Sequence, residues 1–360
     1  MGKKMKVIAW HLPQFHRIPE NDAWWGEGFT EWTSVKRSKP LYKGHHQPRE
    51  PLDDNYYDML DKATMEWQNS LCKQYGVYGF CYYHYWFEGK LLLEKPTENL
   101  LKWKDIDQKF CFSWANGSWT RTWSGKESNT LIQQTYGGQE DWKNHMEYLL
   151  PFFKDERYIR IEDKPVFLLY QSHQIEELDE MMAYFDQYAI DSGLSGIYFV
   201  ETLNSHQQKP YSDKSDAVVW MEPMMTINQI EGGRIKKACN RILQKICNSK
   251  SPYYVNYDDI IKVIEKRQMG TFKSKAEYLS AFVDWDNTPR RQAKGKVIKG
   301  TDPKKFKKQL AILVDKTNED IIFINAWNEW AEGTYLEPDK KNGYAYLEAI
   351  RDLTGNQEGV

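Results

Sequence analysis

The sequence predicts an α/β fold, a (β/α)8 or TIM barrel with elaborated loops after its strands. Three observations support this prediction: eight strand-like apolar segments recur along the chain, helical patterns separate them, and 360 residues suit one barrel. A doubly wound open sheet is the competing fold, but no glycine-rich turn of the GxGxxG type follows the first strand. We therefore expect a single domain over residues 1–360.

The predicted strands are short apolar runs, and the stretches between them repeat apolar residues at helical spacing. The strands are expected at 6–10, 77–83, 109–114, 166–170, 196–201, 217–222, 281–285 and 321–327. Helices are expected at 57–75, 139–153, 175–192, 257–267, 303–316 and 344–353. This alternation of strand and helix is the pattern of a closed parallel barrel.

Composition excludes several classes of function. The net charge is −2 and the pI about 6.5, so the bulk charge does not point to nucleic acid as a partner. Aromatic residues make up 15% of the chain, with 15 Trp and 23 Tyr, and flat aromatic faces suit stacking on sugar rings. No HExxH, EF-hand, P-loop or GxSxG segment occurs, so we expect no metal, no cofactor and no serine nucleophile.

The cysteines and the first residues bear on location. Cys72, Cys81, Cys111, Cys239 and Cys247 form no CxxC pair, and their odd number favours a reducing compartment. Cys81 and Cys111 fall within apolar runs and are expected to be buried thiols. The N-terminal residues lack the apolar core of a signal peptide, and no stretch of ~20 apolar residues occurs. We therefore expect a cytoplasmic protein.

Polar and aromatic residues gather where the predicted strands end. In a (β/α)8 barrel the carboxyl ends of the strands build the active site, so this convergence predicts a site on that rim. The long loop at 15–54, rich in tryptophan, is expected to lie over it, although a packed lid without substrate contact is the alternative. The side chains expected to bind substrate are His11, Gln14, Trp32, Tyr82, His84, Trp114, Asn116, Tyr170, Glu201, Glu222, Trp285, Asp286, Asn287, Arg290, Trp327, Asn328 and Glu337.

The last predicted strand leads into two glutamates, Glu329 and Glu332, flanked by Trp327 and Trp330. If the chain turns helically after the strand, residues three apart share a face, with Cβ atoms roughly 5–6 Å apart. Glycoside cleavage needs two carboxyl groups in different protonation states beside one bond. A surface turn with solvated glutamates is the alternative, but the flanking tryptophans favour a catalytic pair, with Arg290 as the anchor of the carboxylates.

Five segments of the chain resemble a known family. The segment WNEWAEGTYLEP resembles the signature of the endo-α-mannosidases of glycoside hydrolase family 99 and, more closely, WbsX-type proteins of surface-polysaccharide gene clusters. The resemblance extends to HLPQFHRIPENDAWWGEGFTEWTSV, GFCYYHYWF, FSWANGSWTRTW and FVDWDNTPRR, and so to nearly the whole chain. It implies the same barrel fold and a glycan substrate.

The resemblance also implies a retaining mechanism on an α-linked, mannose-like sugar. Glu329 would act as the base that takes the proton of the 2-hydroxyl, which forms a 1,2-anhydro sugar, and Glu332 would act as the acid/base. Ala331 departs from the family pattern, since many endo-α-mannosidases have a histidine there. Two alternatives stay open: a glycosyltransferase of O-antigen, lipopolysaccharide or capsule biosynthesis, and a carbohydrate-binding barrel without catalysis.

Residues 223–255, after the sixth strand, form the largest departure from a minimal barrel, an inserted basic helical segment. Ile235, Cys239, Ile242 and Ile246 fall on one face of its helix. Such a helix can contact a membrane or a lipid-linked glycan, or can pack its apolar stripe on the protein. The shortness of the stripe favours packing on the protein.

Overall fold

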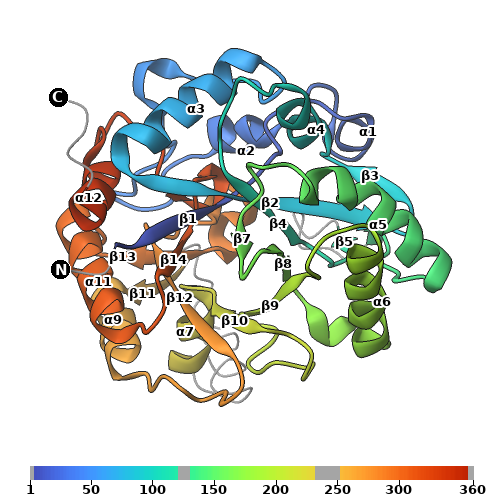
Figure 1. Ribbon diagram of the computed structural model, residues 1–360. Helices are drawn as coiled ribbons and strands as arrows, with labels where there is room; N and C mark the ends of the chain where they lie inside the picture. Colours follow the sequence, from blue (N-terminus) through green and yellow to red (C-terminus); the bar gives the residue numbers. More distant parts are fainter. Residues whose placement is uncertain (1–3, 121–129, 232–251, 356–360) are drawn as a thin grey trace.

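The computed structural model describes residues 4–120, 130–231 and 252–355. Eight parallel strands form its central sheet, and β1 pairs with both β2 and β14, so the sheet closes into a barrel (Figure 1). In chain order the barrel strands are β1 (Lys6–His11), β2 (Val77–Phe87), β4 (Phe110–Trp114), β8 (Lys164–Leu169), β9 (Tyr198–Leu203), β10 (Ala217–Trp220), β12 (Ala276–Phe282) and β14 (Ile321–Asn325). The predicted (β/α)8 barrel is confirmed.

Helices surround this barrel (Figure 1). The longer ones are α3 (Lys62–Tyr75), α4 (Lys95–Lys102), α5 (Gln139–Phe153), α6 (Leu178–Asp191), α9 (Tyr257–Lys266), α11 (Pro303–Lys316) and α12 (Ala345–Thr354). Four short helices, α1 (Pro19–Trp25), α2 (Glu31–Arg37), α7 (Met224–Ile230) and α10 (Thr288–Arg291), lie in the loops after strands. The predicted helices at 139–153 and 303–316 match α5 and α11 at both ends.

Helix α11 shows how the sequence specifies these elements. Asp302 caps its first turn by accepting a hydrogen bond from the Lys305 backbone N–H at 2.9 Å, and Pro303 occupies the first helical position. Phe306, Leu310 and Leu313 lie three or four residues apart and are buried against the barrel. The helix therefore begins where its capping residues stand and packs along one apolar stripe.

Smaller elements decorate the loops. The short strands are β3 (Lys90–Leu92), β5 (Trp119–Thr120), β6 (Thr130–Ile132), β7 (Arg160–Ile161), β11 (Tyr253–Asn256), β13 (Lys296–Lys299), β15 (Asn328–Glu329) and β16 (Thr334–Tyr335). The 3-10 turns are η1 (Leu52–Asp54), η2 (Ser172–Gln174), η3 (Gln292–Lys294) and η4 (Trp330–Glu332). Strands β11 and β13 pair in parallel, and β15 and β16 form a hairpin around η4.

All eight predicted strands are present, but the seventh begins five residues early, at Ala276. The reason is Glu277, a polar residue that sequence patterning reads as loop. In the fold its carboxylate is buried and accepts hydrogen bonds from Trp220 Nε1 at 3.3 Å and the Phe272 backbone N–H at 2.9 Å. Cys81 and Cys111 are buried in β2 and β4, as predicted.

The helix expected within 223–255 lies outside the described residues, which stop at Glu231 and resume at Pro252. Only the flanking elements α7 and β11 are described. In the parts of the chain that the structure describes, the helices are all too short or too polar to cross a membrane.

Candidate active site

A cavity of about 860 Å³ opens where the barrel strands end. Every barrel strand, or the loop that follows it, contributes to the wall. In chain order the wall includes Gln14, Tyr83, Ala115, Tyr170, Asn204, Glu222, Trp285 and Glu329. This is the face on which (β/α)8 enzymes build their active sites.

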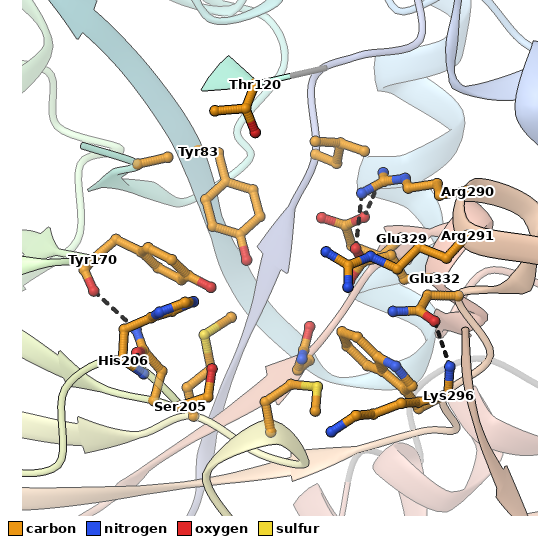
Figure 2. Close-up of a pocket in the computed structure, with 18 of the residues that line it drawn as sticks. Tyr83, Thr120, Tyr170, Ser205, His206, Arg290, Arg291, Lys296, Glu329 and Glu332 are labelled. Atoms are coloured by element: carbon orange, nitrogen blue, oxygen red, sulfur yellow. Dashed lines mark hydrogen bonds and ion pairs between the residues drawn. The ribbon is translucent and has the colours of Figure 1, made fainter. Parts of the chain in front are cut away.

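The turn after β14 brings Glu329 and Glu332 into this cavity together. Glu329 ends β15, and Glu332 ends the 3-10 turn η4, in which residues three apart lie one above the other. Gly333 closes the turn with φ of 68°, and a Cβ there would lie 2.9 Å from the Asp286 backbone nitrogen. Only glycine fits this position, and the turn it permits puts both carboxyl groups on the cavity wall (Figure 2).

Arg290 from α10 holds these two carboxylates and a third one. Its Nη1 donates to Glu332 Oε1 at 2.9 Å, and its Nη2 donates to Glu329 Oε2 at 3.2 Å (Figure 2). The same Nη2 donates to Glu31 Oε1 at 2.6 Å, and that carboxylate also accepts from the Ala331 backbone N–H at 3.1 Å. One guanidinium therefore contacts three glutamates, Glu329 and Glu332 from the turn after β14 and Glu31 from the loop after β1.

The pKa values of both cavity glutamates, Glu329 and Glu332, are raised. Burial raises the pKa of Glu329 to about 8, helped by the charges of Glu332 and Glu31 and opposed by Arg290. Burial likewise raises the pKa of Glu332, against the same arginine. The Glu332 side chain is 24% exposed and that of Glu329 10%, so water favours the charge on Glu332 in the free protein. With a pKa of about 8, Glu329 is the carboxyl group of the pair that retains a proton at neutral pH.

Asp286 supports the turn from behind the cavity. Its backbone N–H donates to the carbonyl oxygen of Glu332 at 2.7 Å. Its carboxylate lies 2.7 Å from His45 Nε2 and accepts from Gln47 Nε2 at 2.8 Å. Burial opposes ionisation of this carboxyl, but the hydrogen bonds and the charge of Arg49 outweigh it and hold the Asp286 pKa at about 2. Asp286 therefore stays charged and fixes the turn to the first loop.

The opposite wall is aromatic. Figure 2 shows Tyr83, Tyr170 and His206 across the cavity from Glu329 and Glu332. Burial raises the pKa of both Tyr83 and Tyr170, so their hydroxyl groups are neutral and able to donate hydrogen bonds. Further rings line the cavity from Trp25, Tyr85, Trp119, Tyr253 and Trp285. Ring faces beside hydroxyl and carboxyl groups are the surface that a sugar needs.

Eight side chains that the sequence analysis singled out line the cavity: Gln14, Tyr170, Glu222, Trp285, Asn287, Arg290, Glu329 and Glu332. Eleven others are buried elsewhere and do not line it: His11, Trp32, Tyr82, His84, Trp114, Asn116, Glu201, Asp286, Trp327, Asn328 and Glu337. These eleven pack or hydrogen-bond behind the wall.

The alternation of side chains along a strand explains in part why some predicted residues line the cavity and others do not. His11 Nε2 bonds Gln68 of α3 at 3.1 Å, and His84 Nε2 lies 2.9 Å from the Nε2 of His145 in α5. Burial lowers the pKa of His11 and of His84 to about 3, so both rings are neutral. On β2, Tyr82 and His84 share the face that looks toward the helices. The alternate residues Tyr83 and Tyr85 are the ones that reach the cavity.

Glu201 and Glu337 are buried carboxylates held by hydrogen bonds. Glu201 accepts from Ser172, Gln207, Tyr211, Ser212 and Ser215, and so fixes the loop after β9. Glu337 accepts from Trp330 Nε1 at 2.7 Å, Gln68 Nε2 at 2.8 Å and Tyr57 at 3.0 Å. Burial raises the Glu337 pKa to about 7. Glu337 thereby holds Trp330 within η4.

The sequence analysis missed Glu31, Tyr83 and Tyr85 as site residues. Counting alternate positions from the end of β2 could have found the two tyrosines, once the inward phase was known. Glu31 lies in the long loop that was expected over the site, at the first position of α2. No pattern distinguishes it from Glu27 in the same loop, which is exposed.

Comparisons with known proteins identify the family of the chain. The family model described as "Glycosyltransferase WbsX" matches residues 7–350. An uncharacterized protein named WxcX, from Xanthomonas campestris pv. campestris, is 34% identical over 352 residues, which are 96% of this chain and 49% of that protein. The chain therefore spans about half the length of the curated relatives that it matches.

Two solved structures share the fold. A glycoside hydrolase-like protein superposes with a TM-score of 0.62 at 11% identity, covering 98% of this chain and 94% of its own. The family 99 endo-α-mannosidase of Bacteroides thetaiotaomicron superposes with a TM-score of 0.59 at 14% identity, covering 97% and 96%.

A (β/α)8 barrel with an acidic, aromatic cavity at the carboxyl ends of its strands is an architecture that a class of carbohydrate-active enzymes uses. Within that class the family follows from the sequence match: this chain belongs to the WbsX family. The resemblance found in the sequence is confirmed.

Proposed function

We propose that the chain is a retaining carbohydrate-active enzyme that cleaves or transfers an α-linked, mannose-like glycan with Glu329 and Glu332. The observation that carries this proposal is the shared guanidinium of Arg290, which holds both carboxylates on the wall of one cavity. A barrel that only bound sugar would not need two acidic groups that share one proton.

In the proposed first step, the Glu329 carboxylate takes the proton of the sugar 2-hydroxyl as O2 attacks the anomeric carbon. The carboxyl proton of Glu332 passes to the departing glycosidic oxygen, which leaves a 1,2-anhydro sugar. In the second step, a water or an acceptor hydroxyl attacks the anomeric carbon and gives its proton to Glu332. The epoxide opens, and O2 recovers its proton from Glu329. Both glutamates then return to their first states.

These two reaction steps require the proton shared by Glu329 and Glu332 to lie on Glu332 when substrate is bound. In the free protein, burial favours it on Glu329, whose pKa is about 8. A sugar 2-hydroxyl that donates a hydrogen bond to the Glu329 carboxylate stabilises its charged form, so binding moves the shared proton toward Glu332. The protonation state needed for the first step is thereby produced by the substrate itself.

Transfer to an acceptor sugar is the alternative outcome of the second step. The family description favours it, because the matching family is described as glycosyltransferases. The two outcomes share the first step and differ only in what attacks the intermediate, water or an acceptor hydroxyl. A transferase that uses nucleotide sugars is the separate alternative, and it would need no 1,2-anhydro intermediate.

The test uses Glu329→Gln and Glu332→Gln, with Glu348→Gln on the exposed face of α12 as the control. Each of the first two variants is incubated with α-mannosyl oligosaccharides, and separately with nucleotide sugars plus an acceptor glycan. We expect each to lose turnover by about 10²–10⁴-fold, and the control to lose none. Release of sugar without nucleotide supports hydrolysis, and full activity in either variant refutes the mechanism.

Aryl α-mannosides separate the two roles. A nitrophenolate leaving group needs no proton, so Glu332→Gln should regain much of its first-step rate on such a substrate, measured as the burst of nitrophenol. Glu329→Gln should stay inactive, because O2 still lacks its base. Rescue of Glu329→Gln in place of Glu332→Gln would exchange the assigned roles.

A further inference from the structure

Two of the four cations on one wall of the cavity have no ion-pair partner among the described residues. Four cations line this wall within one short segment: Arg290, Arg291, Lys294 and Lys296. Arg290 is occupied by three glutamates, and Lys296 pairs with Glu231. Over residues 4–120, 130–231 and 252–355, no carboxylate forms an ion pair with Arg291 or Lys294.

The carboxylates of the cavity wall already form ion pairs with other cations. Besides the glutamates already paired, the remaining one on the wall is Glu222, and Arg267 holds its Oε1 at 2.6 Å. Thr226 donates a second hydrogen bond to the same carboxylate at 2.8 Å. Arg291 and Lys294 are exposed and therefore available to a ligand in the cavity.

The segment that carries these two cations is firmly held. The Asn287 side-chain oxygen accepts from the Lys296 backbone N–H at 2.8 Å, and the Gly295 N–H donates to the Gln292 carbonyl at 2.9 Å. The Ile298 N–H donates to the Trp285 carbonyl at 2.8 Å, which ties the far end of the segment to the loop after β12. A segment whose backbone is already fixed by hydrogen bonds loses less conformational entropy when a ligand binds.

We propose that Arg291 and Lys294 form a subsite for an anionic group on the glycan, a carboxylate or a phosphate, so that the substrate is an acidic sugar chain. This inference rests on the proposed function for its link to catalysis. A guanidinium offers paired donors that match carboxylate and phosphate oxygens, and an ammonium adds a point charge.

The subsite adjoins the catalytic pair. Figure 2 shows Arg291 on the same side of the cavity as Glu329 and Glu332, and the charge of Arg291 lowers the Glu332 pKa. An anion bound at Arg291 would cancel part of that effect. A bound acidic group would therefore raise the Glu332 pKa and favour the proton on this residue, the state that the first step requires.

The test measures binding rather than turnover. The full chain is titrated calorimetrically with methyl α-mannoside, the methyl glycoside of glucuronic acid, and mannose 6-phosphate. We expect the two anionic sugars to bind at least about tenfold more tightly than the neutral one, with the advantage shrinking at high salt. The carboxylate and phosphate arms distinguish which anion fits better.

Variants assign that preference to the segment. Arg291→Gln and Lys294→Gln should each weaken binding of the anionic sugars by about five- to tenfold. Lys308→Gln, which removes an exposed lysine from α11, is the control and should bind as the wild type does. Arg291→Glu should reverse the preference, so that methyl glucosaminide binds more tightly than the glucuronide; thermal melting confirms that each variant is folded.

Equal binding of neutral and anionic sugars by the wild type would overturn the inference, and so would an unchanged preference in the Arg291→Gln, Lys294→Gln double variant. Loss of the proposed catalysis alone would not, because the binding preference is measured without turnover. A protein that hydrolyses neutral α-mannosides but shows no anionic preference would keep the proposed function and lose this subsite.

Discussion

Replacing Arg290 with glutamine tests the charge arrangement of the site without knowledge of the substrate. The variant removes one guanidinium and leaves Glu31, Glu329 and Glu332 without their cation. The arginine side chain is 21% exposed and the three carboxylates between 1% and 24%, so solvent screens these contacts only in part. Removing one partner of a buried ion pair costs about 3–5 kcal/mol. We expect a free-energy loss of that size near pH 8.

The loss should shrink as the pH falls. Without Arg290, Glu329 and Glu332 keep a proton to a larger extent in the folded state, so their folded pKa values rise further above the unfolded value of about 4.3. A group whose folded pKa is raised favours the folded state below its unfolded pKa, and this contribution is lost as the pH rises toward the folded pKa. The deficit of the variant therefore grows by up to about 1.4 kcal/mol per pH unit for each additional proton retained.

Urea unfolding followed by tryptophan fluorescence, from about pH 5 to about pH 8, measures this deficit against the wild type. Arg17→Gln is the matched control, because Arg17 also contacts two carboxylates, Asp22 and Glu27, but on the exposed surface. Its effect should be small and independent of pH. A deficit for Arg290→Gln that is equal at both ends of the range would refute the idea that three carboxylates depend on one cation.

Three further predictions concern the same turn. Gly333→Ala should lower the free energy of unfolding in urea by about 1–3 kcal/mol or more, because φ is positive there and a Cβ would crowd the Asp286 nitrogen. Gly343→Ala is the control, since its φ is 55° but its surroundings are open, and it should lose less; equal losses would contradict the role of crowding. Glu31→Gln should move the pH profile of kcat/KM to lower pH by about one unit, because Glu31 raises the Glu329 pKa, and an unmoved profile would exclude that coupling. Asp286→Asn should lower the free energy of unfolding by about 2–3 kcal/mol at neutral pH. The lowered Asp286 pKa stabilises the fold above about pH 4, and this contribution is lost as the pH falls toward 2. A deficit that persists at about pH 2 would disprove this explanation.

The sequence was sufficient for the barrel because local patterns encode it. The run Ile321–Asn325 is apolar at four of its five positions, which is what a strand covered on both faces requires. The stripe of Phe306, Leu310 and Leu313 likewise fixes which face of α11 is buried. The pair Glu329 and Glu332 could also be predicted from the sequence, because the two glutamates and Gly333 lie within one short turn.

Contacts between residues distant in the sequence could not be predicted in this way. The contact between Arg290 and Glu31 joins residues 259 positions apart, and only closure of the barrel brings them together. Nor does alternation along β2 say which phase faces inward, so Tyr82 was preferred to Tyr83. Glu201 looked like a ligand for sugar because nothing local reveals the five residues that satisfy its carboxylate inside the protein.

The charges around the cavity follow one rule in both of its regions. Where Arg290 faces three glutamates, carboxylates outnumber cations and the Glu329 pKa rises to about 8, and the proposed acid catalysis at neutral pH needs a carboxyl group raised in this way. Arg291 and Lys294 form no ion pair with a carboxylate of residues 4–120, 130–231 or 252–355, so in the proposed subsite an anion of the ligand completes the pairing. Because the two regions adjoin, an acidic ligand at the second raises the proton affinity of Glu332 in the first. In this proposal the charge of the bound glycan therefore influences whether Glu332 carries the proton that the first step needs.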